Sequence, residues 1–338
     1  MPETIGKYIK ILQKLRTMRK KLVRLTMNIN VLIVTVLLLL VVCEVGSRII
    51  FGHSLEFTST EDTLWEIKPD QIGFTVPNRN FANINEFGMR ETVNNIGTYP
   101  QLKIVMIGDS FTFGWGVKDD ETMASQLANI IDRQNVDVSN LGVPGYGIFQ
   151  MIGLYDKKEA MLDADVVVLT FVEDDMLRQP PELMNEKGLE QKQRLREVAR
   201  AVLRKSTFAA VMKPMVKRSL GGIFGLSEEK ELFWPEFWEK DKERMREFKE
   251  VLDSQDKTFV IVPYVYKSGQ EEFLKKAVDF AEENDIIIVK DIGKMRDDFL
   301  SQNEGVALRL DEGHPNELLH RIASEAIYEV LREYKVFD

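Results

Sequence analysis

Short apolar runs alternate with amphipathic helical stretches from about residue 101 onward. The apolar runs are Lys103–Ile107, Val136–Asn140, Val166–Phe171, Thr258–Val262 and Ile286–Val289. The helical stretches include Thr122–Arg133, Glu271–Asn284 and Asn316–Tyr334. Strands that are separated by helices form right-handed βαβ units, and their parallel sheet is buried on both faces. The pattern predicts, over residues 101–338, a flavodoxin-like three-layer α/β/α sandwich with a five-stranded parallel sheet.

An insertion at residues 177–257 interrupts this alternation between the third and fourth strands. It holds charged helical stretches at Glu190–Lys205 and Glu239–Leu252, around an apolar piece at Phe208–Leu226 that glycines break. An insertion this long indicates a lid, a membrane-facing element or a mobile loop. Residues 52–100, before the first strand, are rich in turn formers instead. We expect them to form a stalk or a loop-rich apron on the main domain.

An apolar stretch near the N-terminus predicts one membrane-spanning helix. Val31–Cys43 alone is shorter than the ~20 residues that cross a bilayer, but residues 29–51 reach that length. This longer stretch includes Glu44 and Arg48, which lie four residues apart and so can pair on one helix face. A buried core helix is a poor explanation, because Val31–Cys43 has thirteen residues with one hydroxyl and no charge. A cleaved signal peptide fits poorly too, because no small-x-small pair follows the run.

The charge distribution predicts how this helix is oriented. Residues 1–28 carry eight Lys or Arg and one acid, a net +7, whereas the whole chain carries −9; the other 310 residues therefore carry −16. Basic residues before a span stay on the cytoplasmic side. We expect a basic cytoplasmic tail, an uncleaved signal anchor at residues 29–51 that contacts the lipid bilayer, and an extracytoplasmic body.

Composition narrows the chemistry of the body. With 44% hydrophobic and 29% charged residues the chain is neither disordered nor polytopic, and its acidic balance argues against a nucleic-acid partner. One Cys and three His leave little for a disulfide framework or a multi-histidine metal centre. Metal sites built from carboxylates remain possible on composition alone.

A serine follows the first predicted strand of the sheet directly, in the tripeptide Gly108-Asp109-Ser110. Ligands of parallel α/β sheets bind beyond the carboxyl ends of the strands, so this hydroxyl is a candidate nucleophile. Near the C-terminus, Asp311 precedes His314 by three residues. The Asp311 carboxylate can orient the His314 ring, which then accepts the serine proton as a general base.

Two further strand ends supply candidate oxyanion contacts. Gly142 follows the second strand, where its backbone N–H can face the same crevice, and Asp174 follows the third. Trp115 and Tyr146 flank the predicted site; packing into the sheet and stacking on a sugar are equally open for both.

These blocks together resemble the SGNH, or GDSL-like, hydrolase superfamily over residues 101–334. In that resemblance Ser110 matches the nucleophile, Gly142 the oxyanion glycine, and Asp311 with His314 the closing Asp-x-x-His block. The resemblance implies hydrolysis or transfer of O-acyl groups on surface polysaccharide or lipid esters, with no metal and no cofactor. The anchor and the segment Asn85–Arg90, an Asn-x-x-Gly-x-Arg pattern, are similar to a membrane-anchored subset of the superfamily.

One position departs from the pattern of that superfamily. Asp174 stands where an asparagine usually donates an N–H to the oxyanion, and an ionised carboxylate there repels the developing charge. The departure leaves a second interpretation open: a catalytically weakened module that binds polysaccharide or lipid.

Overall fold

The computed structural model describes residues 2–60, 62–75, 80–93, 101–131, 135–178, 206–208, 211–212, 234–310 and 313–337. The chain divides into two compact units between residues 52 and 53.

The first unit is one long helix, α1 (Pro2–Phe51). Within it, Val23–Phe51 is long and apolar enough to cross a membrane, and an 18-residue window of this stretch has a mean hydropathy of 2.6. Arg48 Nε lies 2.7 Å from Glu44 Oε1, so the predicted pairing on one helix face is confirmed. The apolar side chains from Ile29 to Val42 are exposed in the isolated chain. The helix is therefore a candidate membrane span.

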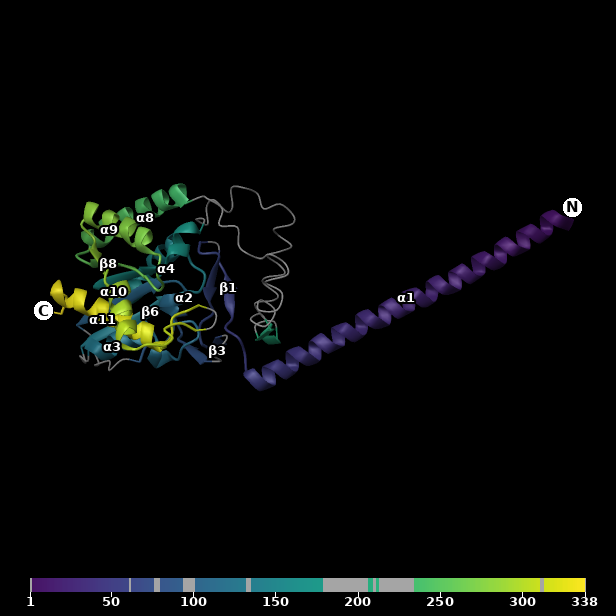
Figure 1. Ribbon diagram of the computed structural model, residues 1–338, viewed down its shortest axis with the longest axis horizontal. Helices are drawn as coiled ribbons and strands as arrows, with labels where there is room; N and C mark the ends of the chain where they lie inside the picture. The colour runs from purple at the N-terminus through teal and green to yellow at the C-terminus, as the bar shows by residue number, and fades with distance from the viewer. Residues whose placement is uncertain are drawn as a thin grey trace. The chain divides into compact units, whose positions relative to one another are not determined.

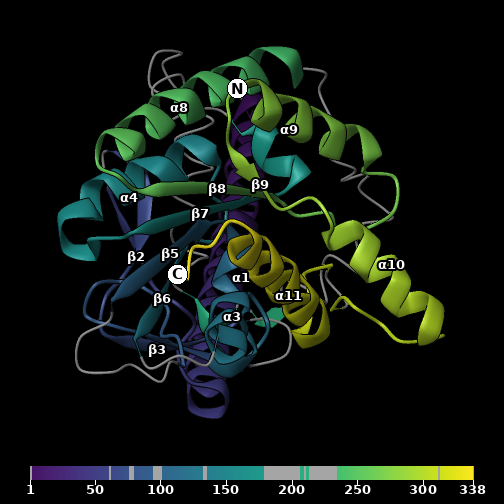
Figure 2. The same ribbon diagram turned by 90° about the vertical axis from the view of Figure 1, so that its left-hand side faces the viewer.

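The second unit is built on a parallel sheet of five strands (Figures 1 and 2). The strands are β5 (Leu102–Gly108), β6 (Val136–Gly142), β7 (Val166–Phe171), β8 (Thr258–Pro263) and β9 (Ile287–Ile288). Their order in the sheet is β6-β5-β7-β8-β9, and each neighbouring pair is parallel. This confirms the predicted flavodoxin-like sheet, although its last strand is shorter than the predicted Ile286–Val289.

Helices cover both faces of the sheet, as Figure 2 shows. One face carries α3 (Met123–Ile131), α10 (Ile292–Gln302) and α11 (Glu317–Glu333). The other carries α4 (Ile148–Leu162), α8 (Trp234–Ser254) and α9 (Glu271–Glu283). Along β5, Ile104 and Met106 face the first layer while Val105 and Ile107 face the second. Because alternate residues of a strand point to opposite faces, a continuous apolar run produces this two-sided burial.

The described residues between 53 and 93 include two antiparallel strand pairs, which lie in the same compact unit as the sheet. The strands are β1 (Phe57–Ser59), β2 (Trp65–Ile67), β3 (Gln71–Thr75) and β4 (Asn80–Ile84). Arg90, just beyond these strands, forms isolated antiparallel β-bridges through its backbone with Ile84 and with Asn140 on β6. The segment before the sheet thus joins its edge strand.

The insertion between β7 and α8 begins with the short helix η2 (Glu173–Leu177). The predicted helix Glu190–Lys205 lies outside the described residues. Of the apolar piece Phe208–Leu226, the structure describes residues 208, 211 and 212. The predicted stretch Glu239–Leu252 lies within α8.

Candidate active site

Ser110 opens the four-residue helix α2 (Ser110–Phe113), immediately beyond the carboxyl end of β5. Asp109 caps this helix, because its Oδ1 accepts the Phe111 N–H at 2.8 Å. Gly108 has to lack a side chain, since a Cβ there would lie 2.0 Å from Thr112 Oγ1. The turn from strand to helix therefore places the half-buried Ser110 hydroxyl at the strand end.

His314 reaches Ser110 from the other end of the chain. Its Nε2 lies 3.0 Å from Ser110 Oγ, across 204 positions of sequence. Two backbone hydrogen bonds hold the main chain of His314 and Gly313 against Leu310: the Gly313 N–H donates to Leu310 O and the Leu310 N–H to His314 O, both at 2.8 Å. Phe111 packs beside the ring, with the two ring centroids 5.5 Å apart. This is the arrangement in which a histidine accepts a proton from a serine.

Asp311 lies outside the described residues. Its pairing with His314 stays a prediction from the Asp-x-x-His spacing.

Asp109 also contacts the hydroxyl, a role that the sequence did not reveal. Ser110 Oγ lies 3.2 Å from Asp109 Oδ2, so the hydroxyl has an acidic partner besides His314. Burial raises the pKa of the Asp109 carboxyl, and the positive charge of Arg178 opposes this shift. The signal in the sequence was the position of Asp109, directly between a strand end and the serine.

Gly142 has a contact that differs from the predicted one. Its N–H donates to Asn140 Oδ1 at 3.0 Å instead of facing an open crevice. A Cβ at this position would lie 2.2 Å from the Phe113 nitrogen. Gly142 thus allows α2 to pack closely on the end of β6, and its N–H is occupied in this structure.

The turn after Gly142 offers another backbone donor. The Tyr146 N–H donates to Val143 O, and Gly145 within this turn has a φ of +89°. A proline followed by a glycine with positive φ is typical of a type II turn. Among the residues that the structure describes, none accepts a hydrogen bond from the Gly145 N–H.

Asp174 is exposed on η2, whereas the next residue, Asp175, is completely buried. Asp175 Oδ2 accepts the Val172 N–H at 2.9 Å, and its Oδ1 lies 3.0 Å from Arg178 Nη1. Burial, reinforced by the nearby Asp109 charge, raises the pKa of Asp175 well above its usual range.

Arg178 joins two of the strand-end loops, because it also donates to the Tyr146 carbonyl oxygen. Sequence reasoning passed over Asp175 and Arg178, since neither position belongs to the predicted serine–histidine pair.

The two aromatic candidates are both explained by packing. Tyr146 is fully buried and its hydroxyl donates to Trp65 O, which rules out stacking on a sugar in this conformation. Trp115 is partly buried against the core, with its ring 6.1 Å from Phe113. In the part of the chain that the structure describes, no three His, Cys, Asp or Glu side chains gather as a metal site would require.

Comparisons with known proteins give structural relatives alone. No protein-family model matches the chain, and no curated protein matches it. A solved structure from the lipolytic G-D-S-L family of Veillonella parvula is 18% identical, covers 68% of this chain and 98% of its own, and has a TM-score of 0.39. A catalytic mutant of an acetylxylan esterase from Geobacillus stearothermophilus is 15% identical, covers 70% and 95%, and has a TM-score of 0.42.

Proposed function

We propose that this chain is a membrane-anchored, extracytoplasmic serine esterase or O-acyltransferase of the SGNH type. The observation that carries the proposal is the 3.0 Å contact between Ser110 Oγ and His314 Nε2 at the carboxyl end of the parallel sheet. Two residues so distant in sequence meet at the place where α/β sheets bind their ligands.

The proposed reaction proceeds in two acyl-transfer steps. Ser110 Oγ bonds to the ester carbonyl carbon while its proton passes to His314 Nε2. The ester C–O bond then breaks, and His314 returns the proton to the departing alcohol. Water or a sugar hydroxyl next attacks the acyl-serine, with His314 again taking and returning the proton. The products are a free acid or a new ester, together with regenerated Ser110.

The other predicted residues have supporting roles in this scheme. Asp311 would hold the protonated His314 ring. For the oxyanion we assign the Ser110 N–H and a second backbone N–H from the β6–α4 loop. Gly145 suits the second role better than Gly142, whose N–H is already bonded to Asn140.

The substrate class follows from location and from family resemblance. An anchor at residues 29–51 with a basic cytoplasmic tail would place the body against the outer face of the membrane. Acylated carbohydrates of the cell surface and lipid esters are the acyl donors within reach there.

The exposed acidic side chain of Asp174 favours a second candidate function, a polysaccharide- or lipid-binding module with weakened catalysis. Such a module would bind ligand equally well with or without the Ser110 hydroxyl.

A substrate panel separates the two functions. The full chain in detergent micelles is incubated with O-acetylated glycans, phospholipids and short-chain p-nitrophenyl esters, with and without sugar acceptors. The released acid is titrated, and acylated acceptor is measured by mass spectrometry. We expect turnover that Ser110→Ala abolishes and that Ser324→Ala keeps, because Ser324 is a buried serine bonded to Met123 O and His320 O. Ligand binding that survives Ser110→Ala, with no turnover by the wild type, would establish the binding module instead.

A further inference from the structure

Arg90 is the largest of the fully buried side chains in the part of the chain that the structure describes, and it comes from outside the α/β sandwich. It follows β4 in the segment that leads from the first unit to the sheet. A buried charge is costly unless ionic and hydrogen-bonding partners compensate for it. The partners of Arg90 therefore indicate what it does.

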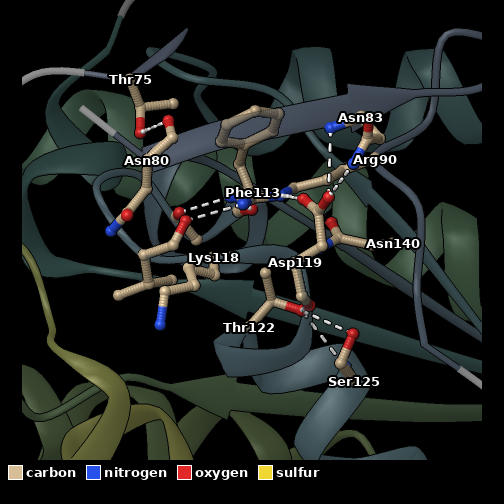
Figure 3. Close-up of polar contacts among 12 residues, drawn as sticks. Thr75, Asn80, Asn83, Arg90, Phe113, Lys118, Asp119, Thr122, Ser125 and Asn140 are labelled. Atoms are coloured by element: carbon tan, nitrogen blue, oxygen red, sulfur yellow. Dashed lines mark hydrogen bonds and ion pairs between the residues drawn. The ribbon is translucent and has the colours of Figure 1, made fainter. Parts of the chain in front are cut away.

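The guanidinium binds three carbonyl groups just beyond the candidate nucleophile. Nη1 donates to Phe113 O at 3.0 Å and to Gly114 O at 2.5 Å, and Nη2 donates to Val117 O at 2.7 Å. The last carbonyls of a helix have no partner within the helix, and α2 is one turn long. Arg90 supplies a donor to the last α2 carbonyl, that of Phe113 (Figure 3), and further donors to the carbonyls of Gly114 and Val117 in the turn that follows.

Asp119 holds the guanidinium in this position. Its Oδ1 accepts from Arg90 Nε at 2.8 Å, and its Oδ2 accepts from Asn83 Nδ2 on β4 at 2.5 Å (Figure 3). The Arg90 side chain is fully buried, whereas the Asp119 side chain is 14% exposed. The two charges thus compensate each other at the edge of the α2 turn.

Movement of the α2 turn would reach Ser110 directly. The N–H groups of Gly114 and Trp115 both donate to Ser110 O, at 3.1 and 3.0 Å. Gly114, whose carbonyl accepts from Arg90, therefore also donates to the backbone of Ser110. A displacement of about 1 Å at a reacting group can cost ~10²-fold in rate.

We propose that Arg90, held by Asp119, is a positioning residue that fixes α2 so that Ser110 Oγ stays in line with His314. The expected effect on turnover rests on the proposed function, whereas the expected effect on the order of α2 does not. The segment 80–93 then completes the active site, although it precedes the sandwich in sequence.

Two variants test the proposal in the full chain in detergent micelles, with p-nitrophenyl acetate as substrate. Arg90→Lys keeps the charge but loses the planar fork that reaches three carbonyls. We expect kcat to fall ~10²-fold while KM stays within about threefold of the wild type. Asp119→Asn, at a partly exposed position, should lower kcat roughly tenfold with the same unchanged KM.

A matched control separates positioning from loss of stability. Arg296 on α10 is also buried, pairs with Asp297 at 2.6 Å and makes none of the α2 contacts. Arg296→Lys should keep kcat within about twofold of the wild type even where it lowers Tm as much as Arg90→Lys does. Equal kcat losses in Arg90→Lys and Arg296→Lys would overturn the proposal. An Asp119→Asn protein whose kcat equals that of the wild type would also overturn the proposal. If Arg90→Lys does not fold, the kcat of Asp119→Asn is the deciding measurement.

Hydrogen–deuterium exchange gives a readout that does not need turnover. The amides of residues 110–117 should exchange roughly tenfold faster in both variants, while those of α9 keep their wild-type rates. Faster exchange throughout the molecule, or unchanged exchange at 110–117, would refute the positioning role. An inactive wild type with the expected exchange pattern would instead refute the proposed esterase function and leave the positioning role standing.

Discussion

The Ser110 hydroxyl has one proton and two acceptors, His314 Nε2 at 3.0 Å and Asp109 Oδ2 at 3.2 Å. Attack on an ester requires the state in which the proton is shared with His314. Asp109 is fully buried and its carboxyl also caps α2. At the scale of single residues, the carboxylate therefore helps to build the turn that carries the nucleophile and also competes for its proton.

Asp174 allows a test of the oxyanion environment. Its carboxylate is exposed, so water screens its repulsion of the oxyanion. We expect Asp174→Asn to raise kcat/KM at neutral pH by about two- to tenfold, because an amide can donate where a carboxylate repels. Steady-state kinetics on a short-chain ester measure this change. A folded variant with activity equal to or below that of the wild type would contradict it.

His320 makes the stability of the fold depend on pH. It is fully buried on α11, and burial, with the nearby Arg90 and His314, lowers its pKa to about 3. Between pH 6.5 and 3 the unfolded chain then binds a proton at this histidine that the folded chain excludes. The free energy of unfolding consequently falls as pH falls, by ~1.4 kcal/mol per unit from this group.

Replacement of that side chain should remove its part of the pH dependence. Between pH 7 and pH 5 we expect the wild type to lose about 2 kcal/mol more unfolding free energy than His320→Leu. Urea unfolding of both proteins at the two pH values measures the difference. Identical pH dependence of the two proteins would show that His320 is not the responsible group.

At the scale of elements, the strands and long helices could be predicted because their side chains follow a period. The predicted Thr122–Arg133 and Asn316–Tyr334 contain α3 and α11, and Thr122 and Asn316 cap those two helices. Short elements carry no such signal. Helix α2 has four residues, and the strands β1 to β4 have three to five each.

The periodicity of apolar residues cannot predict contacts between segments that are distant in sequence. The pairing of Ser110 with His314 was predicted because the chemistry of a nucleophile needs a base. No local sequence pattern predicts that Arg90 binds the carbonyls of α2 and its following turn, although the Asn85–Arg90 motif drew attention to this segment. The contact of the Gly142 N–H with Asn140 depends on how the β6 end turns, which the sequence does not specify.

Gly142 tests the packing of α2 on β6. A methyl group at this position would overlap the Phe113 nitrogen and the Thr112 carbonyl carbon, which are backbone atoms that cannot rotate away. We expect Gly142→Ala to lower the free energy of unfolding by about 1–3 kcal/mol and to reduce ester turnover. Gly153→Ala on α4 is the control, since its nearest neighbour is 3.9 Å away. Equal stability of the two variants would argue against this tight contact.

At the scale of the whole molecule, the charge asymmetry of the chain predicts the orientation that the candidate membrane helix would take. The +7 tail before the apolar helix predicts a cytoplasmic N-terminus. In intact cells, an added protease should therefore digest the 53–338 body from outside. Replacement of Lys20, Lys21 and Arg24 by Gln should increase the protected fraction. A wild-type body that resists protease until the cells are lysed would reverse the orientation.

The central claim, that Ser110 is a nucleophile activated by His314, is tested most directly by covalent labelling. The full chain in micelles is treated with a fluorophosphonate probe, and the labelled peptide is identified by mass spectrometry. We predict the adduct on Ser110, its loss in a folded Ser110→Ala protein, and a fall of ~10⁴-fold or more in ester turnover in that variant. A folded wild type that takes no label, or a Ser110→Ala protein that labels and turns over like the wild type, would contradict the claim.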